Sequence, residues 1–244
     1  MTRRTRWNET IALSAVVLAL LACKRSAEQE QAPPAPAAPA APAAAAGNHA
    51  GTYTISAAAN PGGGGGYKGS VDISAVGSAF KLKWTLEGQP GYSGVGIDQD
   101  GILGVGWGTG ERYGVVVYQV DGGTLKGRWA TSAAEQGVGL ETATGPEGLS
   151  GTYQVVGTNP VGGNSYKGAL AIAPAGSIYT VAWSLTSGEK YSGIGILEGK
   201  TFVVGWGIGG SAGVVLYKSS GTGLDGKWAT PGNTAVGTET LARN

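Results

Sequence analysis

One cysteine, Cys23, and one histidine, His49, limit the chemistry that this chain can perform. Zinc sites built from cysteine and histidine need several such ligands, and Cys–His or Ser–His–Asp catalysis needs a histidine beside its nucleophile. His49 follows a segment rich in alanine and proline, which predicts that it lies at the end of a tether. We therefore expect no metal ion, no cofactor and no catalysis of these kinds.

Paired carboxylates are the other candidates, because a glycosidase needs only two of them. Glu141 and Glu239 are the only carboxylates at matching positions in the two repeats described below, and one acid per repeat cannot act as both acid and base. Asp98, Asp100 and Glu111 lie close together in the first repeat only, where Asp-x-Asp-Gly is typical of a hairpin turn. An enzyme site in one repeat is an alternative, but we expect a non-enzymatic protein.

Aromatic residues recur at matching positions and admit two interpretations. A Trp or Tyr side chain buries roughly 150–250 Å², which favours a role in the core. The alternative is an aromatic ligand site at the mouth of a barrel, for a sugar or a peptide. The candidate residues for such a site are Tyr67, Lys68, Trp84, Trp107 and Trp129, with Tyr166, Lys167, Trp183, Trp206 and Trp228. Lys68 and Lys167 would contact an acidic ligand there, or would otherwise be solvated strand residues.

The matching positions define an internal repeat, and we predict two β-domains, at residues 51–145 and 151–244. Most matches, such as Trp84 with Trp183, are spaced 99 residues apart. Within each copy apolar and polar residues alternate, as expected for strands with one buried face. No segment after residue 50 has a helical period. The predicted strands of the first copy are 51–57, 67–75, 79–87, 92–98, 102–108, 113–120, 124–131 and 137–143.

Short connections rich in Gly, Asp and Asn join antiparallel neighbours. We therefore predict an all-β fold: two tandem copies of a small antiparallel meander barrel with about eight strands each. A sandwich of two four-stranded sheets is the alternative. Alternating glycines in 102–108 suggest a sharp bend, or a ring that lies over bare backbone.

The N-terminal residues have the composition of an export signal followed by a tether. Basic residues precede an apolar run at 11–22 that is too short to span a bilayer as a helix, which is the pattern of a signal peptide. Alternating Pro and Ala at 31–46 favour an extended, disordered linker. We assign 1–22 to the signal peptide and 23–50 to the tether.

The end of the apolar run, Leu20-Leu21-Ala22-Cys23, resembles the lipobox of bacterial lipoproteins. The resemblance implies that the Cys23 thiol carries diacylglycerol, that the chain is cleaved before Cys23, and that a further acyl chain, commonly palmitate, joins the new N-terminus. Lys24 stands where an Asp would signal retention at the inner membrane. The expected location is therefore an exported, lipid-anchored protein at the outer membrane.

Short motifs in the repeats resemble two groups of β-proteins. Gly-Thr-Tyr and Gly-x-x-Trp are similar to segments of avidin-type and lipocalin-type barrels. Asn-Pro, Tyr-Lys-Gly and Gly-Lys-Trp resemble secreted bacterial repeats that are sometimes labelled fibronectin-binding. These resemblances imply a binding module for a host or matrix protein, a glycan or a small ligand. A structural subunit of an envelope assembly is the alternative.

The charge balance argues against nucleic acid as a partner. Three of the 17 basic residues and one of the 16 acidic residues precede Cys23, which leaves 14 basic and 15 acidic residues in the rest of the chain. No basic stripe is present, whereas nucleic-acid-binding surfaces need one. The membrane, through the lipid anchor, is the expected partner.

Overall fold

A computed structural model describes residues 48–109, 112–208 and 212–244, in which nearly all regular structure is β-strand. Predictions for the signal peptide, for Cys23 and Lys24, for most of the tether and for Glu111 lie outside these residues. Each strand predicted for the first repeat is present, with ends within two residues of those expected. Within the described residues, no helix is both long and apolar enough to cross a membrane.

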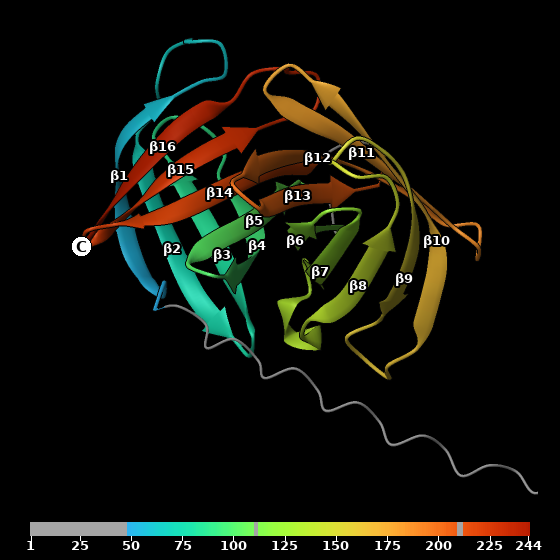
Figure 1. The fold of residues 1–244 in the computed structure, drawn as a ribbon. Coiled ribbons are helices and arrows are strands. Elements are labelled where there is room, and N and C mark those ends of the chain that lie inside the picture. Colours follow the sequence, from blue (N-terminus) through green and yellow to red (C-terminus); the bar gives the residue numbers. More distant parts are fainter. Residues whose placement is uncertain (1–47, 110–111, 209–211) are drawn as a thin grey trace, which may run out of the picture. The chain divides into compact units, whose positions relative to one another are not determined.

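Sixteen strands and one short 3₁₀ turn, η1 (Ala134–Gln136), make up the fold (Figure 1). The strands are β1 (Gly51–Ala59), β2 (Gly69–Val76), β3 (Ala79–Leu86), β4 (Tyr92–Gln99), β5 (Ile102–Gly108), β6 (Tyr113–Asp121), β7 (Thr124–Thr131), β8 (Gly139–Thr144), β9 (Gly151–Thr158), β10 (Ser165–Ala175), β11 (Ile178–Leu185), β12 (Lys190–Glu198), β13 (Thr201–Gly207), β14 (Ala212–Ser220), β15 (Gly223–Ala229) and β16 (Gly237–Arg243).

The strands close into two eight-stranded antiparallel barrels, which confirms the predicted fold class. We call the barrel formed by β1–β5 and β14–β16 the first barrel, and the barrel formed by β6–β13 the second barrel. Each barrel thus takes five strands from one repeat and three from the other. The expectation that 51–145 and 151–244 would each close as a separate barrel is therefore wrong, although both segments are genuine repeats.

The exchange is possible because the two repeats offer equivalent strand edges. In a closed single repeat, Gly108 of β5 would pair with Tyr113 of β6; here it pairs with Ala212, the residue at the matching position of the second repeat. Gly207 pairs with Tyr113 in the same way. Next to these paired strand ends, the Ile208 amide donates a 3.3 Å hydrogen bond to the Arg112 carbonyl.

Each barrel has an apolar cluster of buried side chains in its interior, and a third apolar cluster joins the two barrels. Alternation along β6 separates these regions: Val116 and Tyr118 face the interior of the second barrel, whereas Val115 and Val117 belong to the cluster between the barrels. The joining cluster contains buried residues from β3, β4, β6, β7 and β11–β15. Because Val115 and Val117 are fully buried there, the contact between the barrels is part of the protein core.

The alternating glycines of β5 lie where the barrels approach each other. A Cβ atom on Gly106 would lie 1.9 Å from the carbonyl oxygen of Gly114 in β6, and one on Gly205 would lie 2.0 Å from that of Gly213. Only glycine permits this contact between backbones. Rings also cover bare backbone, as expected: a Cβ atom on Gly114 would meet the indole of Trp206 at 2.4 Å.

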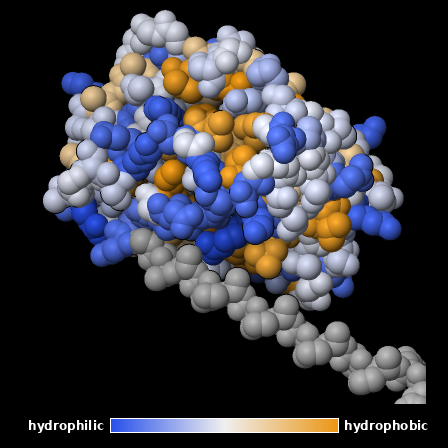
Figure 2. Space-filling model, in the orientation of Figure 1, coloured by the Kyte–Doolittle hydropathy of each residue, from blue (hydrophilic) through white to orange (hydrophobic). Residues whose placement is uncertain are grey.

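The face of the molecule shown in Figure 2 is polar over most of its area. Figure 2 shows apolar side chains near the middle of the face in view, over strands where the barrels meet, with polar side chains around them. Leu140 of β8 and Val156 of β9 are exposed on the second barrel, at 57% and 61% of their surface. Their counterparts in the first barrel are Thr238 and Ser56, so this apolar pair is particular to the second barrel.

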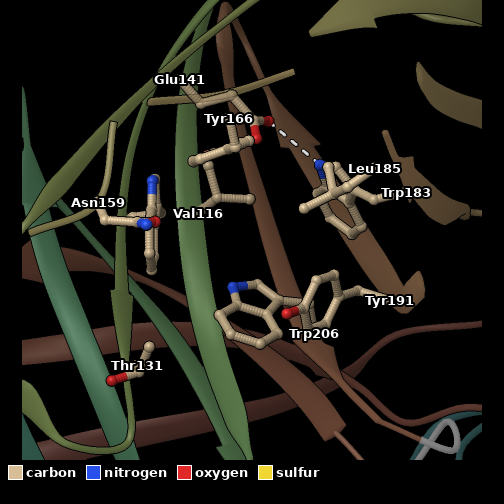
Figure 3. A pocket seen from close by; sticks show the side chains of 10 residues that line it. Val116, Thr131, Glu141, Asn159, Tyr166, Trp183, Leu185, Tyr191 and Trp206 are labelled. Carbon is tan, nitrogen blue, oxygen red and sulfur yellow. Dashed lines mark hydrogen bonds between the residues drawn. The ribbon is translucent and has the colours of Figure 1, made fainter. Parts of the chain in front are cut away.

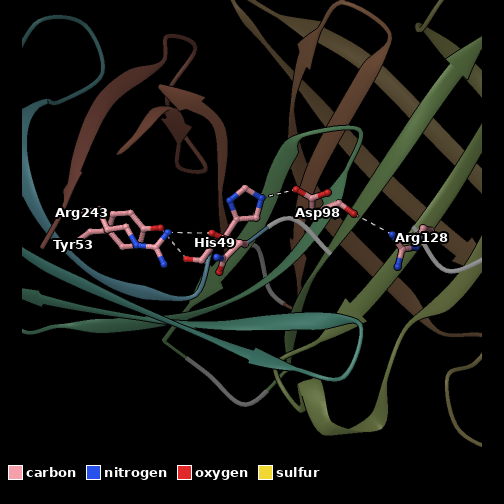
Figure 4. A network of polar contacts seen from close by, with 6 residues as sticks. His49, Tyr53, Asp98, Arg128 and Arg243 are labelled. Carbon is pink, nitrogen blue, oxygen red and sulfur yellow. Dashed lines mark hydrogen bonds and ion pairs between the residues drawn. The ribbon is translucent and has the colours of Figure 1, made fainter. Parts of the chain in front are cut away.

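The folded region begins before residue 51, inside the segment assigned to the tether. His49 is only 4% exposed, and its Nε2 atom lies 2.5 Å from Oδ2 of Asp98 (Figure 4). The Tyr53 hydroxyl donates a 2.9 Å hydrogen bond to the His49 carbonyl, and Arg243 donates to the carbonyls of Asn48 and Ala50. Residues 48–50 therefore belong to the first barrel, and the expected tether boundary at residue 50 is too late.

Candidate functional site: an aromatic cavity with a buried carboxyl

A buried glutamate occupies the interior of each barrel. In the second barrel Glu141 of β8 is 5% exposed and accepts hydrogen bonds from three side chains. Its donors are the hydroxyl of Tyr118 on β6, the hydroxyl of Tyr166 on β10 at 2.8 Å, and Nε1 of Trp183 on β11 at 3.1 Å. Figure 3 shows Tyr166 and Trp183 beside Glu141. The alternation of these strands points all four side chains into the same barrel.

The environment of Glu141 acts on its pKa in two opposite ways. Burial raises the pKa because the charged form loses its hydration, whereas the hydrogen bonds from Tyr118, Tyr166 and Trp183 lower it. Burial is the larger effect, so the pKa lies above its ordinary value of 4.5. The same burial, together with the nearby Glu141 charge, raises the pKa values of Tyr118 and Tyr166, which therefore stay protonated as donors.

Next to Glu141 lies a cavity of about 160 Å³ with largely aromatic walls. Figure 3 shows Glu141 and Tyr166 on one side of it, with Trp206 and Tyr191 on the other. The lining residues are Val116, Trp129, Thr131, Glu141, Asn159, Tyr166, Trp183, Leu185, Tyr191 and Trp206. An engineered apolar cavity of about 150 Å³ binds benzene, so the space fits one ring or one small branched group.

Successive rings of the wall stand nearly at right angles. Trp129 lies at 70° to Tyr166 with ring centroids 6.1 Å apart, and at 70° to Trp206 at 6.4 Å. Tyr191 lies at 74° to Trp206 at 5.3 Å. Rings in this arrangement surround a space from several sides. We call Trp129, Tyr166, Tyr191 and Trp206 the aromatic box.

The first barrel repeats the same constellation. Glu239 is 2% exposed. Its carboxyl accepts hydrogen bonds from the Tyr67 hydroxyl at 2.8 Å, from Nε1 of Trp84 at 3.3 Å and from the Tyr217 hydroxyl. Burial again raises the carboxyl pKa more than the three donors lower it. The two sites therefore have the same chemistry, and each draws its residues from both repeats.

One tyrosine distinguishes the two barrels. In the first barrel the Tyr92 ring lies between Trp84 and Trp107, at centroid distances of 4.8 and 4.7 Å, and packs against the core of that barrel. In the second barrel the equivalent Tyr191 turns its hydroxyl towards Glu189, at 3.2 Å from Oε1. Pro90 occupies the position of Glu189 in the first repeat and offers no such acceptor.

The residues selected from the sequence fall into two groups. Trp129, Tyr166, Trp183 and Trp206 line the cavity of the second barrel, so one residue from the first repeat joins three from the second. Tyr67, Trp84, Trp107 and Trp228 gather in the first barrel, where they pack on its core. In both barrels these aromatic side chains pack on the core, and in the second barrel they also line a cavity.

Lys68 and Lys167 do not lie with the aromatic residues. Both are exposed, because each follows a tyrosine that points into the barrel and so projects from the opposite side of the chain. Sequence reasoning noted Glu141 and Glu239 as matching carboxylates but did not place them in a ligand site. Each glutamate stands at a strand position where the alternating pattern calls for a buried apolar side chain, at the same place in both repeats. This pattern could have indicated a buried carboxyl in each barrel.

The cavity contains one carboxyl group and no basic side chain among its lining residues. Within the described part of the chain, no cluster of three or more His, Cys, Asp or Glu residues is placed to hold a metal ion. The rings of the aromatic box can therefore surround a small group, and the Glu141 carboxyl can accept a hydrogen bond from it.

Asp98 and His49 form a separate polar contact below the first barrel. The Asp98 carbonyl accepts a 3.0 Å hydrogen bond from Arg128 Nη1, and the His49 ring packs on Phe80 at 5.6 Å between centroids. Asp98 is thus paired within the core and is not one of a group of acids. In the second repeat Leu149 and Leu197 occupy the two positions and pack on the apolar core.

Comparison with protein-family models, with curated proteins and with solved structures gives no match for this chain.

Proposed function

We propose that this protein is a non-enzymatic binding lipoprotein, anchored through Cys23, whose second barrel holds one small ligand group in the cavity beside Glu141. The anchor rests on the lipobox resemblance of Leu20-Leu21-Ala22-Cys23. Two or more acyl chains would hold the protein stably on a membrane, and the outer membrane is the proposed location.

The cavity carries the binding part of the proposal. Ligand sites are concave and mostly apolar, with a few polar groups that fix the orientation of the ligand. The second barrel has this composition: an aromatic box, the buried Glu141 carboxyl, and the polar side chains of Thr131 and Asn159 at the wall. A closed barrel of eight strands is also the size that holds one small ligand.

Binding is better supported than catalysis by the composition of the cavity. General acid–base chemistry on a bound molecule needs two groups with separate roles, or one such group and a nucleophile activated by a base. Glu141 is the one carboxyl in the lining, and its oxygens already accept three hydrogen bonds. Burial raises the pKa values of Tyr166 and Tyr191, which disfavours their acting as bases, and the lining contains no His, Lys or Cys. The resulting role of Glu141 is to orient a ligand and to complement its charge.

Ligand retention tests the proposal directly. The full chain, in non-ionic detergent, is incubated with a small-molecule extract of a bacterial envelope, separated from free solutes and analysed by mass spectrometry. Thr131→Phe adds a ring at the cavity wall, and Thr230→Phe makes the same change at the matching position of the second repeat, which lies in the first barrel. We expect a compound retained by the original chain and by Thr230→Phe, but lost from Thr131→Phe.

Equal retention of every compound by the original chain and Thr131→Phe, with both variants folded by circular dichroism, would contradict the binding proposal. The anchor has a separate test. Cys23→Ala is expected to release the protein from the membrane fraction and to abolish incorporation of labelled palmitate. A variant that stays with the membranes would show that lipid is not the tether.

A further inference from the structure

We infer that the ligand group held by the second barrel is a small organic cation of the alkylated ammonium class. This inference rests on the proposed binding function and specifies the chemistry of its ligand. It comes from three features of the cavity: the orientation of its rings, the sign of its charge, and its size.

Ring orientation is the first feature. An aromatic ring carries negative electrostatic potential on its face, so a cation within about 6 Å of the face is attracted to it. In the aromatic box each ring stands at 70° or 74° to the next, so the cavity is enclosed from different directions. A group with methyls in all directions, such as an alkylated ammonium, can contact several rings at once.

The sign of the charge is the second feature. Glu141 is the only ionisable carboxyl among the lining residues, which include no Lys, Arg or His. An ionised carboxylate accepts about four hydrogen bonds, and Glu141 accepts three. A cation in the cavity would compensate the charged form of Glu141, which burial disfavours, whereas an anion would be repelled by it.

Two charged groups lie near the outer end of the box and act on Tyr191 in opposite directions. Glu189 accepts a 3.2 Å hydrogen bond from the Tyr191 hydroxyl and raises its pKa, and Arg112 lowers it. These two side chains do not line the cavity and oppose each other in charge. Glu141 therefore sets the sign of the charge within the cavity.

Size is the third feature. A cavity of about 160 Å³ accepts one small branched group, which matches an alkylated ammonium headgroup better than a long flexible amine. In the first barrel Tyr92 stacks between Trp84 and Trp107 at the equivalent position. We therefore expect one binding site per chain, in the second barrel.

Three probes of similar size and different charge test the inference by isothermal titration calorimetry on the full chain in non-ionic detergent. Tetramethylammonium is the cation, tert-butanol is the neutral counterpart, and pivalate is the anion. We expect tetramethylammonium to bind at one site per chain, at least about tenfold tighter than tert-butanol, the scale of a desolvated cation–π contact. Pivalate is expected to bind most weakly.

Glu141→Gln and Glu239→Gln form a matched pair of variants. Glu141→Gln should reduce the preference for the cation to a fewfold difference, whereas Glu239→Gln, in the closed first barrel, should leave it unchanged. If tert-butanol binds as tightly as tetramethylammonium, the cation inference is overturned and the binding proposal stands. If neither probe binds, whereas retention from the extract depends on Thr131, the ligand is of another class. If neither experiment detects binding, the proposed function fails as well.

Discussion

Tyr166 of the second repeat donates a 2.8 Å hydrogen bond to Glu141 of the first repeat, and Tyr67 of the first repeat donates an equal bond to Glu239 of the second. Each buried carboxyl is therefore held by residues from both repeats. The strand exchange leaves the chemistry of the sites intact, because each strand is replaced by its counterpart at the same register.

A single repeat, residues 48–145, is expected to form a dimer that exchanges β6–β8. If it closed as a monomer, Val95, Ile97, Val115 and Val117 would face water, although all four are fully buried in the intact protein. Large exposed apolar patches are rare on monomers. Size-exclusion chromatography with light scattering would measure the mass, and a soluble, folded monomer at micromolar concentration would contradict the prediction.

Stability is expected to fall as the pH rises from about 4.5, because of Glu141 and Glu239. Both pKa values are raised in the folded protein above the ordinary value of 4.5. Between the ordinary and the folded pKa values the folded state binds more protons than the unfolded state, so the free energy of unfolding decreases with pH. Each carboxyl contributes at most about 1.4 kcal/mol per pH unit in this range.

Urea unfolding of the original chain and of Glu141→Gln/Glu239→Gln from pH 4.5 to 8 would measure this effect. The double variant should have a flatter profile in that range. Glu198 has a lowered pKa because Lys218 and Lys227 bond to it; its contribution is lost only as the pH falls below the ordinary value of 4.5, so it does not add to the slope between pH 4.5 and 8. Parallel profiles for the two chains would rule out this role of the carboxyls.

The buried pair of His49 and Asp98 should be replaceable by leucines. Removing one partner leaves a buried polar group unpaired, so Asp98→Leu alone should cost about 3–5 kcal/mol. His49→Leu/Asp98→Leu copies Leu149 and Leu197 of the second repeat and should be neutral or stabilising by about 1–4 kcal/mol. Chemical denaturation of both variants gives these values. A double variant as unstable as the single one would show that the pair contributes net stability.

Tyr92→Ala is expected to open the first barrel. The substitution removes the ring that lies between Trp84 and Trp107, and so exposes the space beside Glu239. Titration with tetramethylammonium should then give two sites per chain instead of one. Tyr191→Ala, at the matching position, removes one ring of the aromatic box and should weaken binding at the existing site without adding a second one. An unchanged stoichiometry in folded Tyr92→Ala would show that the first barrel is closed by more than this ring.

Strand positions and fold class followed from the sequence because they depend on local patterns. Alternation at Phe80, Leu82 and Trp84 requires one buried and one wet face, and the Asp- and Gly-rich connections require tight turns. The repeated Trp and Tyr residues also indicated where the interior of each barrel lies. These features depend on neighbours within a few residues, and both repeats contain them.

The partners of the strands were decided by the tertiary structure. Gly108 can pair with Tyr113 or with Ala212 at the same register, and no local pattern distinguishes the two. The pairing of β5 with β14 is favoured because it buries Val115 and Val117 between the barrels and brings the backbones of Gly106 and Gly114 into contact. Likewise, the direction of Tyr191 relative to Tyr92 depends on Glu189 and on ring packing. The sequence alone determined two copies of a barrel-forming unit; long-range packing decided that they share strands and that one cavity stays open.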